Sequence, residues 1–333
     1  MEKRKVGPFE VSAIGFGCMG LSSGYGPKTP WWRADRVLKD ALDAGYTFFD
    51  TAMVYGFGHN ETLVGRVLGK HRPGITIASK CGMMVGEERR IDSSPANLKA
   101  NCDSSLKRLN TEVIDLYYLH RWDKRTPIEE AVGAMADLVS AGKIRTIGLS
   151  EVSAATLRRA HAVHPITALQ TEYSPWTRNP EFGVFDACLE LGVTFVAFSP
   201  VGRGFLAGGA SDPAKFGAGD MRAGMPRFQG EALQANLKLL AAFTVLAGEA
   251  GCTPAQLCLA WLMAKDPTIV SIPGSTDRKH VAENAAAAEV RLTPEIMTKV
   301  DALVNATTVT GSRYPPAMQS AVDTERTPAE AAA

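Results

Sequence analysis

The chain has 333 residues, of which 45% are hydrophobic and 21% are charged, and its 36 lysines and arginines balance 35 acidic residues. This is the composition of an ordinary globular protein with a large core. The near-neutral balance, without a basic run, argues against nucleic acid or a membrane surface as a partner, and no apolar stretch is long enough to span a membrane.

The start of the chain is charged and lacks the apolar region of a signal peptide. The six cysteines are scattered and contain no CxxC pair. This is typical of reduced thiols in the cytosol. We therefore expect a cytoplasmic protein, and we predict no metal site.

Strand-like runs alternate with amphipathic helical runs along the chain. The predicted strands cover residues 11–17, 45–50, 75–80, 113–120, 144–150, 168–173, 194–199 and 268–272. The predicted helices cover residues 34–44, 61–69, 94–109, 126–142, 153–161, 182–191, 231–250, 254–264, 278–287 and 294–304. A long polar, glycine-rich loop takes up residues 200–229.

Eight short strands, each followed by a helix, predict an α/β protein with a (β/α)8 TIM barrel, an N-terminal β-hairpin and extra C-terminal helices. A doubly wound sheet is less favoured, because no G-x-G-x-x-G follows the first strand and the strands continue past six. We expect one barrel domain over residues 1–312 and a C-terminal tail over residues 313–333.

Polar side chains stand where predicted neighbouring strands end. Asp50 directly follows Phe48-Phe49, Lys80 ends the next strand, and His120 ends the one after. Tyr55 comes five positions after Asp50, in a glycine-flanked loop. A carboxylate after two phenylalanines is costly to bury unless a cation meets it, and Lys80 is the candidate. Because the carboxyl ends of barrel strands converge on one mouth, we expect these four side chains to lie together.

Each of the four has an ordinary structural interpretation: a turn former, a packed ring, a solvated lysine and a hydrogen-bonded core histidine. Four ionisable groups on three consecutive strand ends are hard to explain as packing alone. Together they indicate carbonyl reduction. Tyr55 would be the general acid, Lys80 would lower its pKa from about 10, Asp50 would hold Lys80, and His120 would orient the carbonyl oxygen. Hydride must come from a cofactor.

At these residues the sequence resembles the aldo-keto reductases over nearly its whole length. The motifs are Gly45-Tyr46-Thr47-Phe48-Phe49-Asp50-Thr51-Ala52 with Tyr55-Gly56, Ala78-Ser79-Lys80, residues 114–120, Gly148-Leu149-Ser150, residues 170–174, residues 199–206, Ile272-Pro273-Gly274-Ser275 and Glu283-Asn284. The stretches 173–178 and 227–231 look like the bacterial and plant branch with pyridoxal-reductase-like and auxin-induced-type members.

The resemblance implies a catalytic tetrad of Asp50, Tyr55, Lys80 and His120. It also implies NADPH bound across the barrel mouth, with NADH possible. By resemblance, the cofactor would be held in three places: its carboxamide by Ser150 and Gln170, its pyrophosphate by Ser199, Pro200, Val201, Gly202, Arg203, Gly204 and Phe205, and its adenosine and 2′-phosphate by Ser275, Arg278, Glu283 and Asn284. The backbone amides of the two glycines and the charge of Arg203 are suited to phosphate oxygens.

Two positions depart from the family pattern. Glu151 stands where much of the family has asparagine, although this branch often has glutamate. Relatives commonly carry two or three basic residues after the Ile272-Pro273-Gly274 motif, whereas Asp277 in this chain would repel a 2′-phosphate.

Large apolar side chains are candidates for lining the mouth, namely Trp31, Trp32, Met53, Met83, Met84, Trp122 and Trp176. Of these, we take Trp31, Met53 and Trp122, with His120, as the predicted substrate-binding residues, which would suit an apolar or aromatic aldehyde. The physiological substrate and the oligomeric state stay open.

Two other functions are compatible with this scaffold. One is a cofactor-binding regulatory subunit resembling potassium-channel β-subunits, although the intact tetrad favours turnover and no docking segment is evident. The other is a lyase that uses Lys80 as a Schiff-base amine. Asp50 argues against the lyase, because it would hold Lys80 protonated.

Overall fold

The protein is described by a computed structural model that places residues 1–83, 90–327 and 330. Eight parallel strands form one sheet in the order β3 to β10. Their bounds are β3 (Phe16–Gly17), β4 (Phe48–Asp50), β5 (Thr76–Cys81), β6 (Ile114–Leu119), β7 (Ile144–Ser150), β8 (Ile166–Glu172), β9 (Thr194–Phe198) and β10 (Ile269–Ile272). Ile14 pairs in parallel with Ser271, and Gly15 N donates to the Ser271 carbonyl at 2.8 Å. These contacts close the sheet into a barrel.

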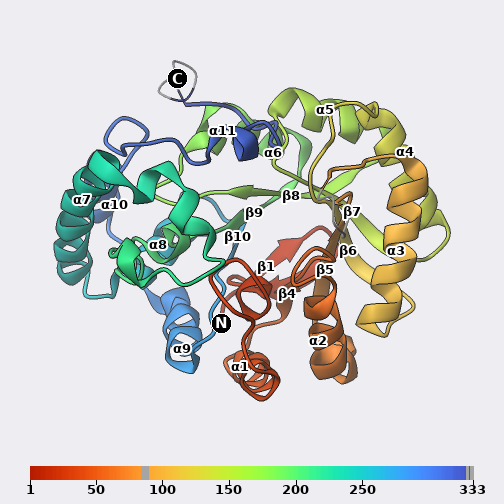
Figure 1. Ribbon diagram of the computed structural model, residues 1–333, viewed down its shortest axis with the longest axis horizontal. Coiled ribbons are helices and arrows are strands. Elements are labelled where there is room, and N and C mark those ends of the chain that lie inside the picture. The colour runs from red at the N-terminus through yellow and green to blue at the C-terminus, as the bar shows by residue number, and fades with distance from the viewer. Residues whose placement is uncertain (84–89, 328–329, 331–333) are drawn as a thin grey trace.

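Helices surround the strands (Figure 1). They are α1 (Trp31–Asp43), α2 (His59–Leu68), α3 (Pro95–Leu109), α4 (Ile128–Ser140), α5 (Ala154–Val163), α6 (Val184–Leu191), α7 (Gly230–Glu249), α8 (Pro254–Lys265), α9 (Arg278–Ala286), α10 (Pro294–Leu303) and α11 (Pro316–Gln319). The strands are buried on both faces because helices cover the outer face and side chains fill the interior; every residue of β5 and β6 is buried.

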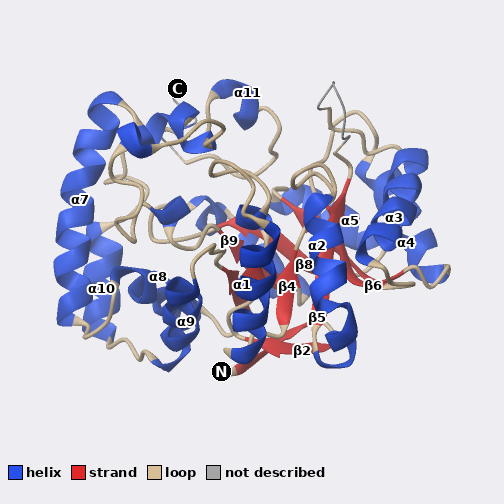
Figure 2. Ribbon diagram, turned by 60° about the horizontal axis from the view of Figure 1, so that its bottom comes forward, coloured by secondary structure: helices blue, strands red, loops and turns tan. Residues whose placement is uncertain are grey.

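An antiparallel hairpin of β1 (Lys3–Val6) and β2 (Phe9–Ser12) lies at the end of the barrel where the strands begin. Val6 and Val11 pack with Phe48 and Leu116 in the barrel interior. Figure 2 shows this hairpin beside the N-terminus, with α11 at the opposite end of the molecule. The predicted TIM barrel, with its N-terminal hairpin and extra C-terminal helices, is confirmed.

The predicted first strand, residues 11–17, is divided in two. Its first residues belong to β2 and its last to β3. Ser12 makes the bend between them, because its hydroxyl donates to the Ile14 carbonyl at 2.8 Å and its amide donates to the Thr47 hydroxyl at 2.7 Å. A run of apolar residues cannot show such a bend, since both halves have the composition of strand.

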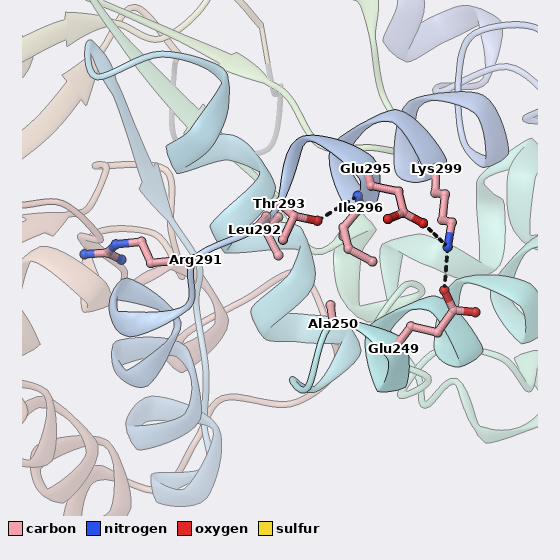
Figure 3. A pocket seen from close by; sticks show the side chains of 8 residues that line it. All are labelled: Glu249, Ala250, Arg291, Leu292, Thr293, Glu295, Ile296 and Lys299. Carbon is pink, nitrogen blue, oxygen red and sulfur yellow. Dashed lines mark hydrogen bonds and ion pairs between the residues drawn. The ribbon is translucent and has the colours of Figure 1, made fainter.

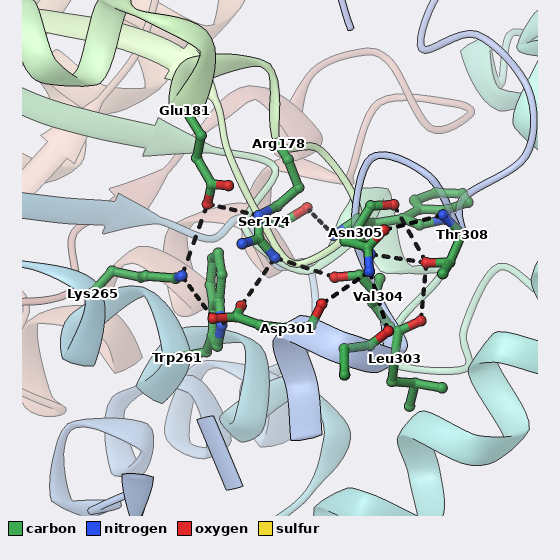
Figure 4. A network of polar contacts seen from close by, with 12 residues as sticks. Ser174, Arg178, Glu181, Trp261, Lys265, Asp301, Leu303, Val304, Asn305 and Thr308 are labelled. Carbon is green, nitrogen blue, oxygen red and sulfur yellow. Dashed lines mark hydrogen bonds and ion pairs between the residues drawn. The ribbon is translucent and has the colours of Figure 1, made fainter. Parts of the chain in front are cut away.

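A polar network fastens the loop after β8 to the helices α8 and α10 (Figure 4). Arg178 donates to Glu181 at 2.7 Å and lies 3.1 Å from Asp301. Lys265 also reaches Asp301, at 2.9 Å, and both cations lie against the ring of Trp261. This network holds the outer layer together on one side of the barrel.

The segment after α10 crosses the end of the barrel at which the strands finish. Lys124 donates to the carbonyl of Val322 at 2.6 Å, and Asp323 accepts from the amide and hydroxyl of Ser153 at 3.2 and 3.1 Å. The described part of the predicted tail is therefore bound to the barrel, while residues 328–329 and 331–333 lie outside the described residues. No helix in the described ranges is long and apolar enough to cross a bilayer.

Candidate active site

Three neighbouring strands bring the predicted tetrad together. Asp50 is the last residue of β4, Lys80 is the next-to-last of β5, and His120 directly follows β6. The turn after β4 carries Tyr55 back over this strand end, where its ring meets that of His120 edge-on at 5.8 Å between centroids. The predicted clustering of these four side chains is present.

Lys80 is the centre of the cluster and is fully buried. Its ammonium is ion-paired with Asp50, and it donates to the Thr51 carbonyl at 2.8 Å and to the Tyr55 hydroxyl at 3.2 Å. The second oxygen of Asp50 accepts from the side-chain amide of Gln170 at 2.8 Å. The cation that the buried carboxylate requires is therefore Lys80, as predicted.

The protonation of this pair follows from its surroundings. Burial disfavours the Lys80 ammonium, but Asp50 and then Tyr55 outweigh it, so the pKa of Lys80 is raised above its ordinary value. A lysine held in its charged form is a poor nucleophile. This finding weighs against the Schiff-base hypothesis.

The pKa of Tyr55 is set by burial and by two neighbouring charges that act in opposite directions. Burial raises this pKa, the Lys80 ammonium lowers it, and Asp50 raises it again, and the net direction is upward. The predicted lowering by Lys80 is present but is smaller than the effect of burial. Tyr55 therefore keeps its proton at neutral pH, which is the form that a general acid needs.

His120 is buried and neutral. Burial, then Arg121 and Lys80, hold the pKa of His120 well below its ordinary value. Its Nδ1 atom has no hydrogen-bond partner among the residues that the structure places. A neutral imidazole has one N–H to donate and cannot supply a positive charge, so this side chain is suited to orienting an oxygen atom.

Ser150 and Gln170 end up side by side, because they are paired in register between β7 and β8. The hydroxyl of Ser150 lies 3.2 Å from a guanidinium nitrogen of Arg121, which also donates to the His120 carbonyl at 2.6 Å. Sequence reasoning missed Arg121. A cation directly after His120, at the end of a strand, was the available indication.

The loop 199–205 is wound tightly. Ser199, Gly202, Arg203 and Gly204 all have positive φ, at 50°, 60°, 58° and 86°. A Cβ on Gly202 would lie 2.8 Å from the ring of Trp176, so glycine is required there. The amides of Gly202 and Gly204 donate within the turn to the carbonyls of Ser199 and Val201, at 2.9 and 3.2 Å.

Arg203 points inward from this loop. Its guanidinium donates to Glu172 at 2.5 Å and to the Tyr314 hydroxyl at 3.0 Å, and the residue is only 8% exposed. Phe205 is also buried and stacks on Trp176 with ring centroids 4.3 Å apart. These two side chains fix the loop, and the charge of Arg203 is neutralised by a buried acid.

The residues predicted around an adenosine phosphate lie near the start of α9. Arg278 pairs with Asp40 of α1 at 2.5 Å. Asp277 accepts from the Lys279 amide at 2.8 Å and so caps the helix. The Ser275 hydroxyl donates to the Asp277 carbonyl at 3.0 Å. Glu283 and Asn284 lie within α9, and Asn284 is buried.

The predicted substrate-binding side chains have different surroundings. Trp31 meets the His59 ring edge-on at 5.8 Å and lies under Arg66, Met53 is buried, and the Trp122 indole donates to the Thr126 carbonyl at 2.7 Å.

Of the other mouth candidates, Trp32 is 73% exposed and Trp176 is buried against Phe205. Met83 forms an isolated bridge with Ile91, and Met84 lies outside the described residues.

A surface pocket of about 290 Å³ lies away from these residues, between the end of α7 and the start of α10 (Figure 3). Lys299 spans its rim, 3.1 Å from Glu249 and 2.9 Å from Glu295. None of its lining residues belongs to the strand ends. We therefore locate the candidate site by the buried polar cluster and not by this hollow.

A closed (β/α)8 barrel with a buried lysine–aspartate pair touching a tyrosine, beside a neutral histidine, defines a class of barrel oxidoreductases. The model of the aldo/keto reductase family matches residues 13–305, and the chain belongs to this family. The family predicted from the motifs is confirmed, and the protein is an oxidoreductase.

Relatives agree along nearly the whole chain. A protein of Schizosaccharomyces pombe named aldo-keto reductase yakc, with NADP(+) in its name, is 43% identical over 328 residues, or 96% of each chain. A glycerol dehydrogenase from Gluconobacter oxydans has a TM-score of 0.83 at 26% identity and covers 94% of this chain and 98% of its own. An aldo-keto reductase from Klebsiella pneumoniae in complex with NADPH has a TM-score of 0.71 at 27% identity and covers 91% of this chain and 96% of its own.

Proposed function

We propose that the protein reduces an aldehyde or ketone to the alcohol with NADPH. The observation that carries the proposal is the contact of one buried ammonium, that of Lys80, with both the Asp50 carboxylate and the Tyr55 hydroxyl. The NADP(+) named for the yeast relative and the NADPH bound to the Klebsiella structure support the choice of cofactor.

Each side chain of the buried cluster has a separate role in this reaction. NADPH, when bound, supplies the hydride. We place the carbonyl oxygen beside Tyr55 and His120, and the neutral His120 ring fixes its direction by a hydrogen bond. Tyr55 donates its proton to the oxygen as negative charge develops there. Lys80 stabilises the phenolate that remains, and Asp50 keeps Lys80 charged and in place.

The residues at the mouth fit a nicotinamide cofactor. Ser150 and Gln170 offer a hydroxyl and an amide side by side, which can pair with a carboxamide. The donation of the Gln170 amide to Asp50 leaves its side-chain oxygen for the carboxamide N–H group. Gln170 would thus connect the bound cofactor to the tetrad.

The preference for NADPH rests on the rim near α9. The Asp277 carboxylate is engaged in capping α9, which weakens its repulsion of a 2′-phosphate. Arg278 is 62% exposed and shares Asp40 with Arg36, so its side chain can turn toward a phosphate at small cost. Fluorescence titration should give a lower dissociation constant for NADPH than for NADH. Equal constants would contradict the role of Arg278.

Turnover is tested by following the loss of NADPH absorbance with 4-nitrobenzaldehyde or pyridoxal. Tyr55→Phe should lower kcat by about 10²- to 10⁴-fold, because the general acid is lost, and should leave NADPH binding intact. The matched control is Tyr46→Phe, since Tyr46 is a buried tyrosine whose hydroxyl, among the residues the structure places, bonds a backbone carbonyl alone, that of Val281 at 3.0 Å. Full turnover by Tyr55→Phe would overturn the mechanism. A regulatory protein would bind NADPH without turning over any carbonyl.

A further inference from the structure

We propose that Arg313, in the segment after α10, is a positioning residue for the nicotinamide half of the cofactor site, acting through Glu151. The inference rests on the proposed function, because it takes Ser150 and Gln170 as the carboxamide ligands. Arg313 is 2% exposed and Glu151 is 1% exposed. Two guanidinium nitrogens of Arg313 donate to the two oxygens of Glu151, at 2.9 and 2.6 Å, across 162 residues of sequence.

Glu151 joins the two strand ends that carry the proposed ligands. It directly follows Ser150, and its amide donates to the Gln170 carbonyl at 3.1 Å. Its carboxylate also accepts from the amide of Glu172 at 3.0 Å. A displacement of Glu151 would therefore shift both Ser150 and Gln170.

Arg313 keeps this carboxylate in place. Burial raises the pKa of Glu151, but Arg313 and then Arg121 outweigh it and hold that pKa below its ordinary value. Without Arg313, a buried charge would lose its bidentate partner, and the carboxylate would be drawn toward water. The backbone of Glu151 adds to this tendency, because its φ of 56° is unfavourable for a residue other than glycine.

The segment after α10 also accepts hydrogen bonds from the side chains of two other residues whose backbone is left-handed. Arg203, with φ 58°, donates to the Tyr314 hydroxyl at 3.0 Å. Lys124, also with φ 58°, donates to the carbonyls of Ser320 and Val322 at 3.2 and 2.6 Å. The loops after β6, β7 and β9 thus each contain a strained residue whose side chain ends on the C-terminal segment. This segment acts as a strap that sets the shape of the mouth.

The main experiment compares full-length Arg313→Met with a matched control, Arg72→Met. Arg72 also makes a two-pronged contact with a buried carboxylate, that of Asp115 at 2.5 and 3.2 Å, but at the end of the barrel where the strands begin. Arg313→Met should raise the NADPH dissociation constant about 10- to 100-fold, since a small misplacement of binding groups has effects of that size. The aldehyde KM at saturating NADPH should stay unchanged. Arg72→Met should lower the melting temperature and leave NADPH binding unchanged.

A double variant separates the positioning of the cofactor ligands from a general loss of stability. Glu151→Gln combined with Arg313→Met removes both charges, so NADPH should bind more tightly to the double variant than to Arg313→Met alone. Arg313→Lys keeps the charge without the two-pronged contact and should give an intermediate dissociation constant in a folded protein. Hydrogen exchange without cofactor should speed up at residues 148–152 in Arg313→Met and not in Arg72→Met.

The proposal is overturned if Arg313→Met and Arg313→Lys both bind NADPH as the wild type does. It is equally overturned if Arg72→Met weakens NADPH binding as much as Arg313→Met. Failure of the proposed function would look different, because the wild-type protein itself would then neither bind NADPH nor reduce 4-nitrobenzaldehyde.

Discussion

The two ends of the barrel use buried charge in different ways. Where the strands begin, Arg4 donates to the carbonyls of Met263, Asp266 and Ile269 at 2.8, 2.9 and 2.5 Å, and Arg72 pairs with Asp115. Arg4 is held mainly by backbone carbonyls, with Glu2 3.9 Å away, and Arg72 is held by one acid. Where the strands finish, Lys80 is shared between Asp50 and Tyr55. The comparison teaches that burial of charge alone does not mark a site; what distinguishes Lys80 is that it contacts the Tyr55 hydroxyl beside a neutral histidine.

The largest expected effect comes from Lys80→Met, which removes the ammonium that contacts both Asp50 and Tyr55. The Asp50 carboxylate would lose its cation in a buried position, which costs about 3–5 kcal/mol of unfolding free energy. Turnover of 4-nitrobenzaldehyde should fall by about 10³-fold or more, because Tyr55 loses the charge that stabilises its phenolate. Chemical denaturation and steady-state kinetics measure the two effects.

The control for this variant is Lys265→Met, which removes a partly buried lysine that pairs with Asp301 in the outer layer. It should lower stability by about 1 kcal/mol or less and leave turnover unchanged. Comparable losses of turnover in the two variants would show that the charge of Lys80 has no special role in the reaction.

An intermediate effect is expected from Arg4→Met at the opposite end. Charge-assisted hydrogen bonds to three carbonyls near the end of α8 would be lost, which should cost about 2–3 kcal/mol of unfolding free energy. The kcat and the NADPH dissociation constant should stay at wild-type values. A tenfold fall in kcat would show that the two ends are coupled.

The smallest effect is expected from pH. The pKa of His120 lies well below its ordinary value of about 6.5, and that of Tyr55 lies above about 10. A general acid acts in its protonated form, so kcat for reduction should be lost only as pH rises through the Tyr55 pKa. We expect a flat kcat from about pH 6.5 to 9. A step in kcat near pH 6.5 would show that His120 titrates during turnover.

The clustering of Asp50, Lys80 and His120 was predictable because it depends on strand order alone. Asp50, Lys80 and His120 each stand at the end of a recognisable apolar run, and parallel barrel strands bring those ends together. Lys80 could be chosen as the partner of Asp50 because adjacent strands leave few alternatives. The division of the chain into a barrel of residues 1–312 and a tail stays a prediction.

Other features could not be read from the chain. Arg203 was predicted beside a pyrophosphate, and its guanidinium instead meets Glu172 and Tyr314 in this structure. Arg278 was predicted beside a 2′-phosphate, and it is paired with Asp40, 238 positions away. Nothing local distinguishes an arginine that faces a ligand from one that meets an acid brought from another part of the fold.

The sequence by itself determined the alternation of strands and helices, hence the barrel, and the polar residues that end its strands. These depend on periodicity and on turn residues, which are local properties. Only the tertiary structure decided which way the pKa of Tyr55 moves, because burial is set by packing from every side. It alone also joined Arg313 to Glu151, since no pattern in the chain fixes where a C-terminal segment crosses the strand ends.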